Sequence, residues 1–326
     1  MAGIFTISLD FELHWGVFDK KDRQSRKTCY LNTLQSIPEV LQLFAQYDVH
    51  ATWAVVGGLM AKDQQEWEEW KPQVQPDYTV EKYSPYKWVH QNSLNNEYQW
   101  AHFAPLEIET ILKYPGQELG THTFSHYYCL EQLKGADAFD ADLKAAKTAA
   151  LKYNRQPASL VFPRNQFNPS HLKICYENGI KTVRSNPLNW FWSPIPDKGS
   201  NTLRKIFRTG DAYVPMSIKR MSYPLDVIKV VPGQPLQLPA SRLFRPWSPR
   251  FPFANKLTLR RTLKELHTAA RRNECYHLWW HPENFGDYPR ENIQNLRILL
   301  QHYKQYKDRY GMKSWNMGEY ADHLTK

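Results

Sequence analysis

Runs of apolar and β-branched residues alternate along the chain with runs of helical periodicity. The first run, Ile4–Phe11, is rich in apolar and β-forming residues, as in a buried strand of a parallel sheet. The clearest helical run, Ala138–Tyr153, is dense in Ala and Lys and has acidic residues near its start. Strands and helices in alternation predict an α/β fold. The predicted strands are Ile4–Phe11, His50–Gly57, Glu118–His122, Ser159–Arg164, Ile180–Arg184, Asp226–Val231 and Tyr276–His281. The predicted helices are Ile37–Tyr47, Ala138–Tyr153, Pro169–Asn178, Asn255–Glu274 and Arg290–Tyr310.

Two stretches interrupt this alternation. Residues 60–116 form an insertion that is rich in aromatic residues, and residues 185–254 form one that is basic and rich in proline. Because proline disfavours regular helix, we expect much of the second insertion to be irregular. Neither stretch shows an internal repeat. We therefore interpret residues 1–326 as a single domain with two insertions that shape its site.

Composition narrows the class of protein. Hydrophobic residues make up 42% of the chain and charged residues 23%, which suffices for a full core and excludes an intrinsically disordered protein. No uncharged apolar run approaches the roughly 18 residues that a membrane-spanning helix needs. The four cysteines form no CxxC pair, and no basic segment of a secretory signal precedes the first strand. We expect a reduced, cytoplasmic protein.

The positive charge is concentrated in one part of the chain. The net charge is +10, and residues 184–274 hold 17 basic and 5 acidic residues, so this part carries the whole surplus. Within it, residues 240–256 interleave Arg with Phe and Trp, a mixture typical of segments that bind an anionic membrane surface. A phosphate-bearing sugar, an anionic polysaccharide or a merely solvated basic face are the alternatives. No nucleic-acid-binding motif occurs, so we expect no nucleic acid partner.

Polar residues cluster where the predicted strands end, which in a parallel sheet is the edge that lines a ligand site. Asp10 and Glu12 end the first strand, and residues two apart on a strand share a face. Two carboxylates on one face repel each other unless a cation lies between them. His122 and His126 end another strand, and in a helical turn their spacing would put both imidazoles on one side, as in many metal sites.

Two further strand ends carry groups suited to binding and acid–base chemistry. Arg164 follows Phe162 and Pro163, and its guanidinium would fix a carboxylate. His281 ends an otherwise apolar strand, where a histidine would give a proton to a leaving group. Each signal alone also fits a structural role. Taken together, the strand ends predict a carboxylate–His–His site with open positions for water and substrate, as in catalytic metal sites.

In these motifs the chain resembles the polysaccharide deacetylase family, also known as carbohydrate esterase family four or the NodB-homology domain. The resemblance implies a distorted (β/α)7 barrel, into which the two insertions would be set. The similar segments, in family order, are Ser8–Glu12 (SLDFE), Ala51–Gly57 (ATWAVVG), Gly120–His126 (GTHTFSH), Val161–Asn165 (VFPRN) and His277–His281 (HLWWH).

The resemblance also implies catalytic roles. Asp10 would be the general base, and Arg164 would tether and orient it, although the family's usual loop differs here. His281 would be the general acid. A backbone N–H near Asn165 would help to stabilise the oxyanion, so Asn165 is counted among the substrate-binding residues.

A metal site is implied as well. Glu12 takes the place of the family's usual metal-binding aspartate, and His122 and His126 complete the ligand set. Glu12 is one methylene longer than aspartate, so the ion must lie slightly farther from the strand or the backbone must retreat. This ligand set favours Zn²⁺, with Co²⁺, Ni²⁺ and Fe²⁺ as alternatives.

The implied reaction is removal of an N-acyl group, acetyl or formyl, from an amino sugar during synthesis of a surface polysaccharide or glycan precursor. Trp15, Trp190 and Trp192 offer stacking faces for a sugar ring. Our hypothesis is that the sugar is linked to a nucleotide or a polyprenyl phosphate, and that the enzyme works in the cytoplasm or peripherally at the cytoplasmic face of the membrane.

Three other functions remain open on the same pattern. A metal-independent, allantoinase-like amidohydrolase would open a cyclic amide on this fold. A retaining glycoside hydrolase of a related barrel would need a second carboxylate about 5 Å from the first. A carbohydrate-binding pseudo-enzyme would need no general acid. The intact base, ligand set and acid favour the metal-dependent deacetylase.

Overall fold

The computed structural model describes residues 2–132, 135–187 and 221–325. In these residues the strands form one curled parallel sheet, in the order β6–β5–β4–β3–β2–β1–β8–β7, and β9 pairs with β1. The chain passes directly from β6, which pairs with β5, to β7, which pairs with β8, and so joins the two edges of the sheet. This is the predicted distorted (β/α) barrel. The strands are β1 Ile4–Phe11, β2 Ala51–Val55, β3 Gln117–Thr121, β4 Ser159–Val161, β5 Thr182–Ser185, β6 Leu236–Pro239, β7 Arg242–Leu243, β8 Cys275–Trp280 and β9 Lys313–Ser314.

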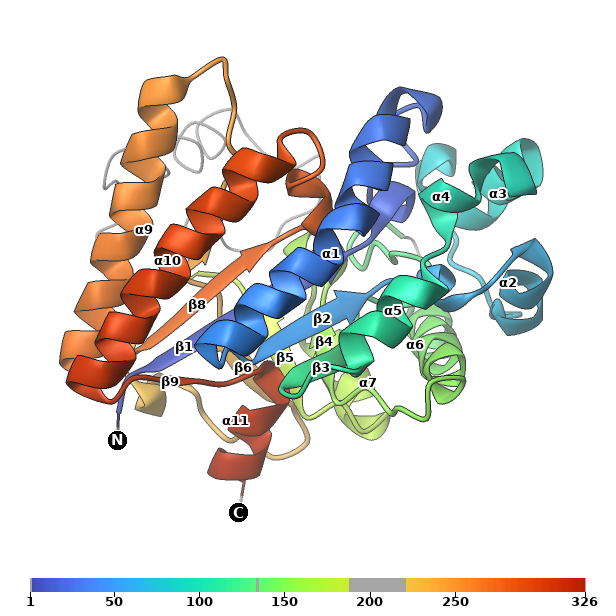
Figure 1. Cartoon of the computed structure of the whole chain (residues 1–326). Helices are drawn as coiled ribbons and strands as arrows, with labels where there is room; N and C mark the ends of the chain where they lie inside the picture. The colour runs from blue at the N-terminus through green and yellow to red at the C-terminus, as the bar shows by residue number, and fades with distance from the viewer. Residues whose placement is uncertain (1, 133–134, 188–220, 326) are drawn as a thin grey trace.

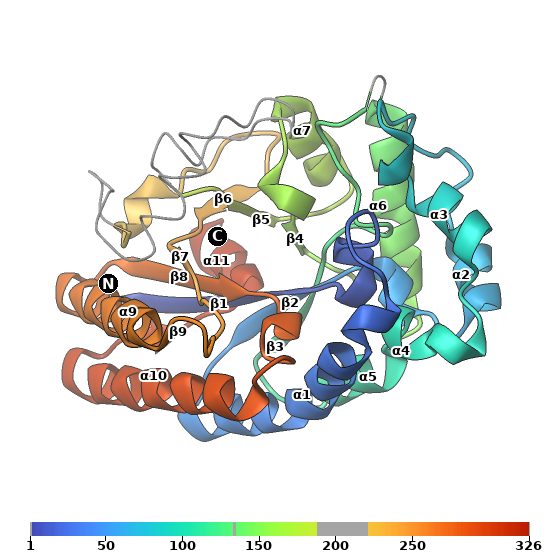
Figure 2. The same ribbon diagram turned by 90° about the horizontal axis from the view of Figure 1, so that it is seen from above.

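Helices cover the outside of the curled sheet. α10, α1 and α5 lie side by side with α9 next to α10, and α6 and α7 lie together on another side (Figures 1 and 2). Several helices begin at a proline, whose fixed φ suits a first turn, and α1, α9 and α10 end beside a left-handed residue. The helices are α1 Lys27–Tyr47, α2 Gln64–Trp70, α3 Pro85–Asn92, α4 Gln99–His102, α5 Pro105–Leu112, α6 Ala136–Leu151, α7 Pro169–Glu177, α9 Pro252–Arg272, α10 Pro289–Tyr310 and α11 Met317–Leu324.

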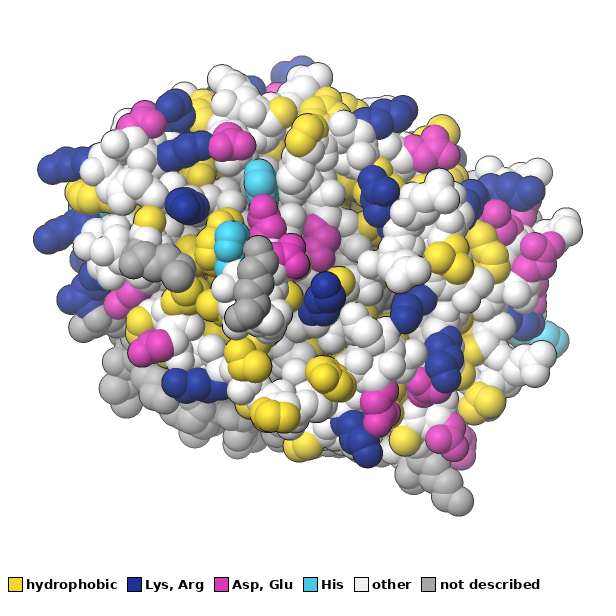
Figure 3. Space-filling model, turned by 90° about the horizontal axis from the view of Figure 1, so that it is seen from below, with side chains coloured by type: hydrophobic (Ala, Val, Ile, Leu, Met, Phe, Trp, Pro, Cys, Tyr) yellow, Lys and Arg dark blue, Asp and Glu magenta, His cyan; other side chains and the backbone are white. Residues whose placement is uncertain are grey.

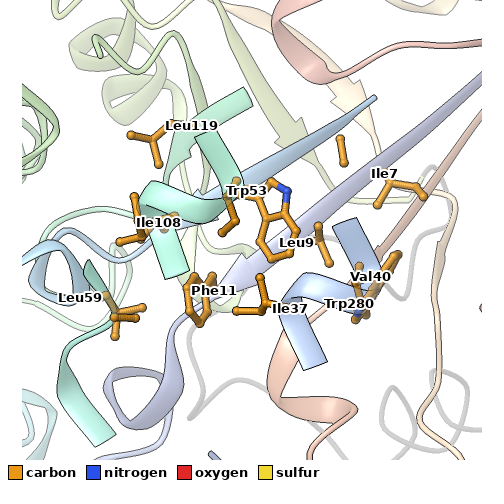
Figure 4. Close-up of a cluster of buried hydrophobic side chains, with 14 of the residues drawn as sticks. Ile7, Leu9, Phe11, Ile37, Val40, Trp53, Leu59, Ile108, Leu119 and Trp280 are labelled. Carbon is orange, nitrogen blue, oxygen red and sulfur yellow. The ribbon is translucent and has the colours of Figure 1, made fainter. Parts of the chain in front are cut away.

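β1 shows how the sequence positions the site. Its side chains alternate between two faces of the sheet. Ile7, Leu9 and Phe11 belong to the large hydrophobic core between the sheet and α1 (Figure 4). Ser8 and Asp10 lie between them in sequence and are buried inside the barrel, where both bind the same guanidinium. The strand therefore carries a carboxylate to the interior of the barrel at its carboxyl end.

The structure differs from the predicted elements in several places, among them strands β6 and β7, which were not predicted. α1 begins at Lys27, not at Ile37, and continues through Pro38, because the helix already buries one face from Cys29 onward. The predicted strand Asp226–Val231 is wrong, since a 3₁₀ turn occupies its start and the two valines at its end are exposed. The short strand β9 and helix α11 after α10 were not predicted.

The predicted insertion at 60–116 contains α2, α3, α4 and α5. It packs onto the barrel through aromatic side chains: Trp67 is fully buried, and Trp70, Trp88 and Trp100 are partly buried against the main core. The other predicted insertion, 185–254, is described only at residues 185–187 and from residue 221 onward. Within the described parts of the chain, no helix has both the length and the apolarity that crossing a bilayer would require.

Candidate metal centre and active site

The two histidines that follow β3 are brought together by a turn. Thr123 and His126 have left-handed φ angles of 65° and 57°, so the segment is not helical and the expected helical turn is wrong. Asp142 of α6 fixes this turn by accepting the N–H of Phe124 at 2.7 Å. The spacing nevertheless has the expected result, because the rings of His122 and His126 lie 5.1 Å apart, centre to centre.

Glu12, just beyond β1, faces both imidazoles. Its Oε2 lies 2.9 Å from Nε2 of His126 and 3.3 Å from Nε2 of His122. Nδ1 of His122 lies 2.8 Å from the carbonyl oxygen of Val161 and donates its proton there, so Nε2 is the nitrogen that faces Glu12. All three side chains are buried, and their ligand atoms lie within 4.8 Å of one another.

The chemistry of this cluster fits a divalent cation. Burial opposes ionisation of Glu12, but His281 and His126 outweigh it and hold the pKa of Glu12 well below its ordinary value. Burial lowers the pKa of His126, which favours the neutral imidazole that metals bind. Oε2 of Glu12 is buried and faces only the imidazoles of His122 and His126, with no backbone or hydroxyl donor within the described chain. A cation among one carboxylate and two imidazoles would satisfy these groups and keep further coordination positions open.

Asp10 is held by Arg184 of β5. Nη1 and Nη2 of Arg184 donate to the two carboxylate oxygens of Asp10, each at 2.6 Å. The guanidinium also donates to Oγ of Ser8 and to Oδ1 of Asn165, both at 3.1 Å, and lies 4.3 Å from the ring centre of Trp279. Burial raises the pKa of Asp10, but Arg184 more than compensates, so the pKa lies below its ordinary value. Asp10 is therefore ionised at neutral pH.

The predicted role of Arg164 is wrong. Its Nη2 pairs with Asp19 at 2.9 Å, and its guanidinium lies 3.6 Å from the ring centre of Tyr128. The left-handed φ of Arg164, 55°, turns the residue out of the line of β4. Arg164 still lines the pocket described below, but the arginine that orients Asp10 is Arg184, which the sequence places at the end of another predicted strand.

His281 lies at the edge of the same group, after β8. Its Nε2 is 3.4 Å from Oε1 of Glu12 and 3.9 Å from Oδ2 of Asp10. The side chain is 30% exposed, whereas those of Asp10 and Glu12 are nearly inaccessible. Trp279 packs edge-on against the imidazole, with ring centres 5.7 Å apart. His281 therefore combines contact with solvent and proximity to both carboxylates, as a proton donor to a leaving group requires.

Glu283 is a carboxylate in the site that was not predicted. Its Oε1 accepts the backbone N–H of Glu12 at 3.0 Å and also that of Leu13. Burial and the nearby carboxylate of Glu12 raise the pKa of Glu283 to about 8. The sequence signal was its place two residues after His281, where the chain turns back from the strand end. Glu283 fixes the backbone that carries the candidate metal ligand.

The structure contradicts one residue of the predicted aromatic platform and does not describe the other two. Trp15 is fully buried, stacks on Trp67 with ring centres 5.7 Å apart, and donates its indole N–H to the carbonyl of His102, so the prediction that it binds sugar is wrong. Trp190 and Trp192 lie outside the described residues. The N–H of Asn165 itself donates to the carbonyl of Phe162 at 2.9 Å, which removes it as an oxyanion donor.

The candidate ligands, Asp10 and His281 line one pocket of about 480 Å³ at the carboxyl ends of the strands. Its inner part is acidic and its outer wall is basic, because Lys20, Lys21 and Arg26 contribute to the lining. The remaining lining residues are Asp10, Glu12, Leu13, Gly16, Val17, Tyr30, His122, His126, Arg164, Asn165, Trp279, His281, Glu283 and Asn284.

Comparisons with known proteins show which family and which folds the chain resembles. Residues 28–183 match the family model described as polysaccharide deacetylase. This range includes His122 and His126 but neither β1 nor β8, so the structure, not the match, places Asp10, Glu12 and His281 beside them. This part of the chain, just under half of its length, is similar to the polysaccharide deacetylase family. No curated protein matches the sequence.

Solved structures share the fold at low sequence identity. A Mycobacterium smegmatis protein assigned to the polysaccharide deacetylases is 14% identical, with a TM-score of 0.61 over 99% of this chain and 91% of its own. A 4-alpha-glucanotransferase from Thermococcus litoralis is 11% identical, with a TM-score of 0.55 over 99% of this chain and 41% of its own. A GH57-type branching enzyme from Pyrococcus horikoshii is 11% identical, with a TM-score of 0.53 over 100% of this chain and 71% of its own. At these identities the likeness concerns the fold alone.

Proposed function

We propose that the protein is a metal-dependent hydrolase that removes an N-acyl group, acetyl or formyl, from an amino sugar. One observation carries this proposal. A carboxylate–His–His cluster, a carboxylate clamped by an arginine and a partly exposed histidine meet in one pocket. The family supports a carbohydrate deacetylase, and the reaction below follows from the side chains.

Glu12, His122 and His126 would hold a divalent ion, which would supply Lewis-acid stabilisation of the charge that develops on the acyl oxygen. Asp10 would accept a proton from the attacking water, and Arg184 keeps Asp10 ionised and aimed into the pocket. The water oxygen would form a bond to the amide carbon as it gives this proton to Asp10.

Breakage of the C–N bond requires a proton on the sugar nitrogen, because an amine anion is a poor leaving group. His281 gives this proton from the rim of the pocket, 3.9 Å from Asp10. The products are a free amine on the sugar and a carboxylate. Trp279, edge-on to His281, holds the imidazole in this position.

Metal content tests the proposal directly. We expect close to one divalent ion per chain in the purified protein by elemental mass spectrometry, and its loss in His122→Ala. His302→Ala, a change on the surface of α10 far from the cluster in sequence, is the matched control and should keep the ion. If the wild-type protein holds no ion even after Zn²⁺, Co²⁺, Ni²⁺ or Fe²⁺ is added back, the metal mechanism is wrong, and a metal-independent amidohydrolase or a binding protein becomes the better reading.

The basic wall of the pocket supports an anionic substrate, such as a sugar that carries a phosphate. Lys20 and Lys21 are exposed, and neither has an ion pair within the described chain. Arg26 already forms an ion pair with Asp287, in which its Nη1 lies 3.2 Å from Oδ2. We expect N-acetylglucosamine 1-phosphate to bind more tightly than N-acetylglucosamine, and Lys20→Ala/Lys21→Ala to abolish this difference. Equal binding of both sugars to the wild type would argue for a neutral substrate.

A peripheral contact with an anionic membrane, and with it a cytoplasmic location at the membrane face, is supported by the start of α9. Phe251 and Phe253 are 58% and 73% exposed, and Arg250 beside them is exposed as well. Trp247 packs on Tyr288 with ring centres 5.0 Å apart. This contact places the segment before α9 next to the loop after His281. We expect the protein to sediment with phosphatidylserine vesicles at low salt, and Phe251→Ser/Phe253→Ser to stay in solution. Failure of the wild type to sediment would contradict the membrane contact without touching the reaction.

A further inference from the structure

Gly16 lies directly against the carboxylate of Glu12. It ends the 3₁₀ turn Leu13–Gly16 that follows β1. A Cβ atom at this position would overlap the carboxyl group of Glu12, including Oε2, from which it would lie 2.7 Å away. The φ angle of Gly16 is outside the left-handed region, so the backbone alone does not demand glycine here. The space that a side chain would take is occupied by the carboxylate.

We propose that Gly16 is a positioning residue of the metal centre, which makes room for the long side chain of Glu12 and keeps its carboxylate against His122 and His126. The proposal rests on the proposed function, because it concerns the ligand role of Glu12. A glutamate reaches one methylene farther from the strand than an aspartate would. The structure accommodates this extra length in the gap that the missing side chain of residue 16 leaves.

The backbone around this turn is unable to retreat. Glu283 accepts the N–H groups of Glu12 and Leu13, and the N–H of Trp15 donates to the carbonyl of Glu12 at 3.0 Å. The indole of Trp15 is fully buried against Trp67. A side chain at position 16 therefore has to displace the carboxylate and not the chain.

Displacement of the carboxylate disrupts a metal site more than it disrupts the fold. A carbon atom needs about 3.5 Å to an oxygen atom, so Oε2 of Glu12 would have to move by roughly 1 Å. Metal–ligand distances in working sites vary by only about 0.2 Å. Since Glu12 is the end of a flexible side chain, Gly16→Ala can relieve the overlap at little cost in stability, but the ligand leaves its place beside Nε2 of His126.

A double-mutant cycle separates this mechanism from a general effect of residue 16. Metal-free protein would be titrated with Zn²⁺ by calorimetry for the wild type, Gly16→Ala, Glu12→Asp and the double variant. We expect Gly16→Ala to weaken Zn²⁺ binding by about 100-fold and Glu12→Asp by about 10-fold. In the Glu12→Asp background the added methyl group no longer meets the shorter carboxylate, so Gly16→Ala should change the affinity by less than about threefold.

Gly318→Ala is the matched control. Gly318 also faces a glutamate, with a Cβ that would lie 2.7 Å from Oε1 of Glu118, and its φ is likewise outside the left-handed region. Glu118 belongs to the opposite end of the barrel, so this change should leave Zn²⁺ affinity unaltered. Circular dichroism and thermal unfolding would confirm that all variants fold.

The outcomes distinguish this inference from the proposed function. If Gly16→Ala binds Zn²⁺ like the wild type, or if it weakens binding equally in both backgrounds, Gly16 does not act through the Glu12 carboxylate, although the metal site stands. If the wild-type protein binds none of Zn²⁺, Co²⁺, Ni²⁺ or Fe²⁺, both the inference and the proposed function are overturned.

Discussion

The two ends of the same sheet use similar residues for different purposes. At the carboxyl ends of the strands, Glu12 meets His122 and His126. At the amino ends, Nδ1 of His50 lies 2.7 Å from Oε1 of Glu319, and Glu118 lies nearby on β3. Figure 3 views the molecule from below, onto the side of α11, and shows histidine and acidic side chains close together near its centre. Residue type alone therefore does not separate a site from a structural contact.

The two ends differ in whether their polar groups are satisfied. Oε2 of Glu118 accepts from the hydroxyl of Thr52 at 2.6 Å and the N–H of Gly318 at 3.0 Å, and Oε1 accepts from the hydroxyl of Ser159 at 2.5 Å. Oε2 of Glu12 is buried and faces the imidazoles of His122 and His126, with no backbone or hydroxyl donor within the described chain. The hydrogen bonds of Glu118 are complete and tie α11 to the barrel. The carboxylate of Glu12 keeps the capacity to bind a ligand.

The pKa values of the two buried glutamates move in opposite directions. Burial raises the pKa of Glu118, because its hydrogen-bond donors are neutral and compensate only in part. Burial acts on Glu12 as well, but the histidines around it hold its pKa well below the ordinary value. A carboxylate that stays ionised without complete hydrogen bonding is suited to bind a cation, and a carboxyl surrounded by hydroxyls is suited to hold two elements together.

The largest expected effect compares a catalytic with a structural carboxylate. Asp10→Asn removes the proton acceptor and should lower kcat by about 100- to 10,000-fold while metal content stays at the wild-type level. Glu118→Gln, equally buried at the other end, should leave kcat within about twofold. Turnover of an N-acetylated sugar phosphate, measured by amine release together with metal content, checks both. A loss of turnover in Glu118→Gln of the same size would mean that the two ends are not functionally distinct.

The next effect concerns which arginine serves Asp10. Arg184→Met leaves the carboxylate buried and unpaired and should cost about 3–5 kcal/mol in the free energy of unfolding at neutral pH. The pKa of Asp10 would rise, so the acidic limb of kcat/KM against pH should move to higher pH. The stability that the low pKa of Asp10 provides is present above its unfolded value and is lost as the pH falls through the folded value, so the deficit of the variant should shrink in acid.

Arg164→Met is the control for this change. It breaks the pair with Asp19 and should also destabilise the protein, but the acidic limb of kcat/KM should stay in place because Asp10 keeps its partner. A shift of that limb in Arg164→Met and none in Arg184→Met would restore the role that the sequence assigned to Arg164.

The pattern along β1 and the spacing of the histidines sufficed to predict which side chains come together in the candidate site. Alternation put Asp10 inside the barrel, and a strand end followed by GTHTFSH supplied two ligands within four residues. Even there, the expected geometry was a helical turn, while the actual turn depends on left-handed residues that are held by Asp142 of α6. The local sequence thus identified the candidate ligands but not the backbone that arranges them.

Long-range contacts account for the errors. Two arginines, Arg164 and Arg184, end predicted strands, and only the packing of β5 inside the barrel decides which guanidinium reaches Asp10. Trp15 seemed available for a sugar because it follows Glu12, but Trp67 from the insertion between β2 and β3 covers it. Side chains alternate along β5, so Thr182 and Arg184 lie on one face of the sheet. This alternation was the feature of the sequence that could have identified Arg184 as the partner of Asp10.

The smallest expected effect belongs to the closed end of the barrel. The hydrogen bond to Glu319 raises the pKa of His50 above its ordinary value, in spite of partial burial and of Lys307 nearby, and Asp48 at 3.9 Å acts in the same direction. A histidine with a raised pKa adds stability that is fully present below its unfolded pKa of about 6.5 and is lost as the pH rises through the folded pKa.

We therefore expect the free energy of unfolding of the wild type to fall slightly between about pH 6 and pH 8, relative to His50→Gln. Because the pair is partly exposed, the difference should stay below about 1 kcal/mol and shrink in high salt. Urea unfolding across this pH range measures it, and an equal slope in both proteins would show that His50 does not tie α11 to the barrel through its charge. Turnover should be the same in His50→Gln as in the wild type at every pH, since this pair is at the end of the sheet opposite the pocket.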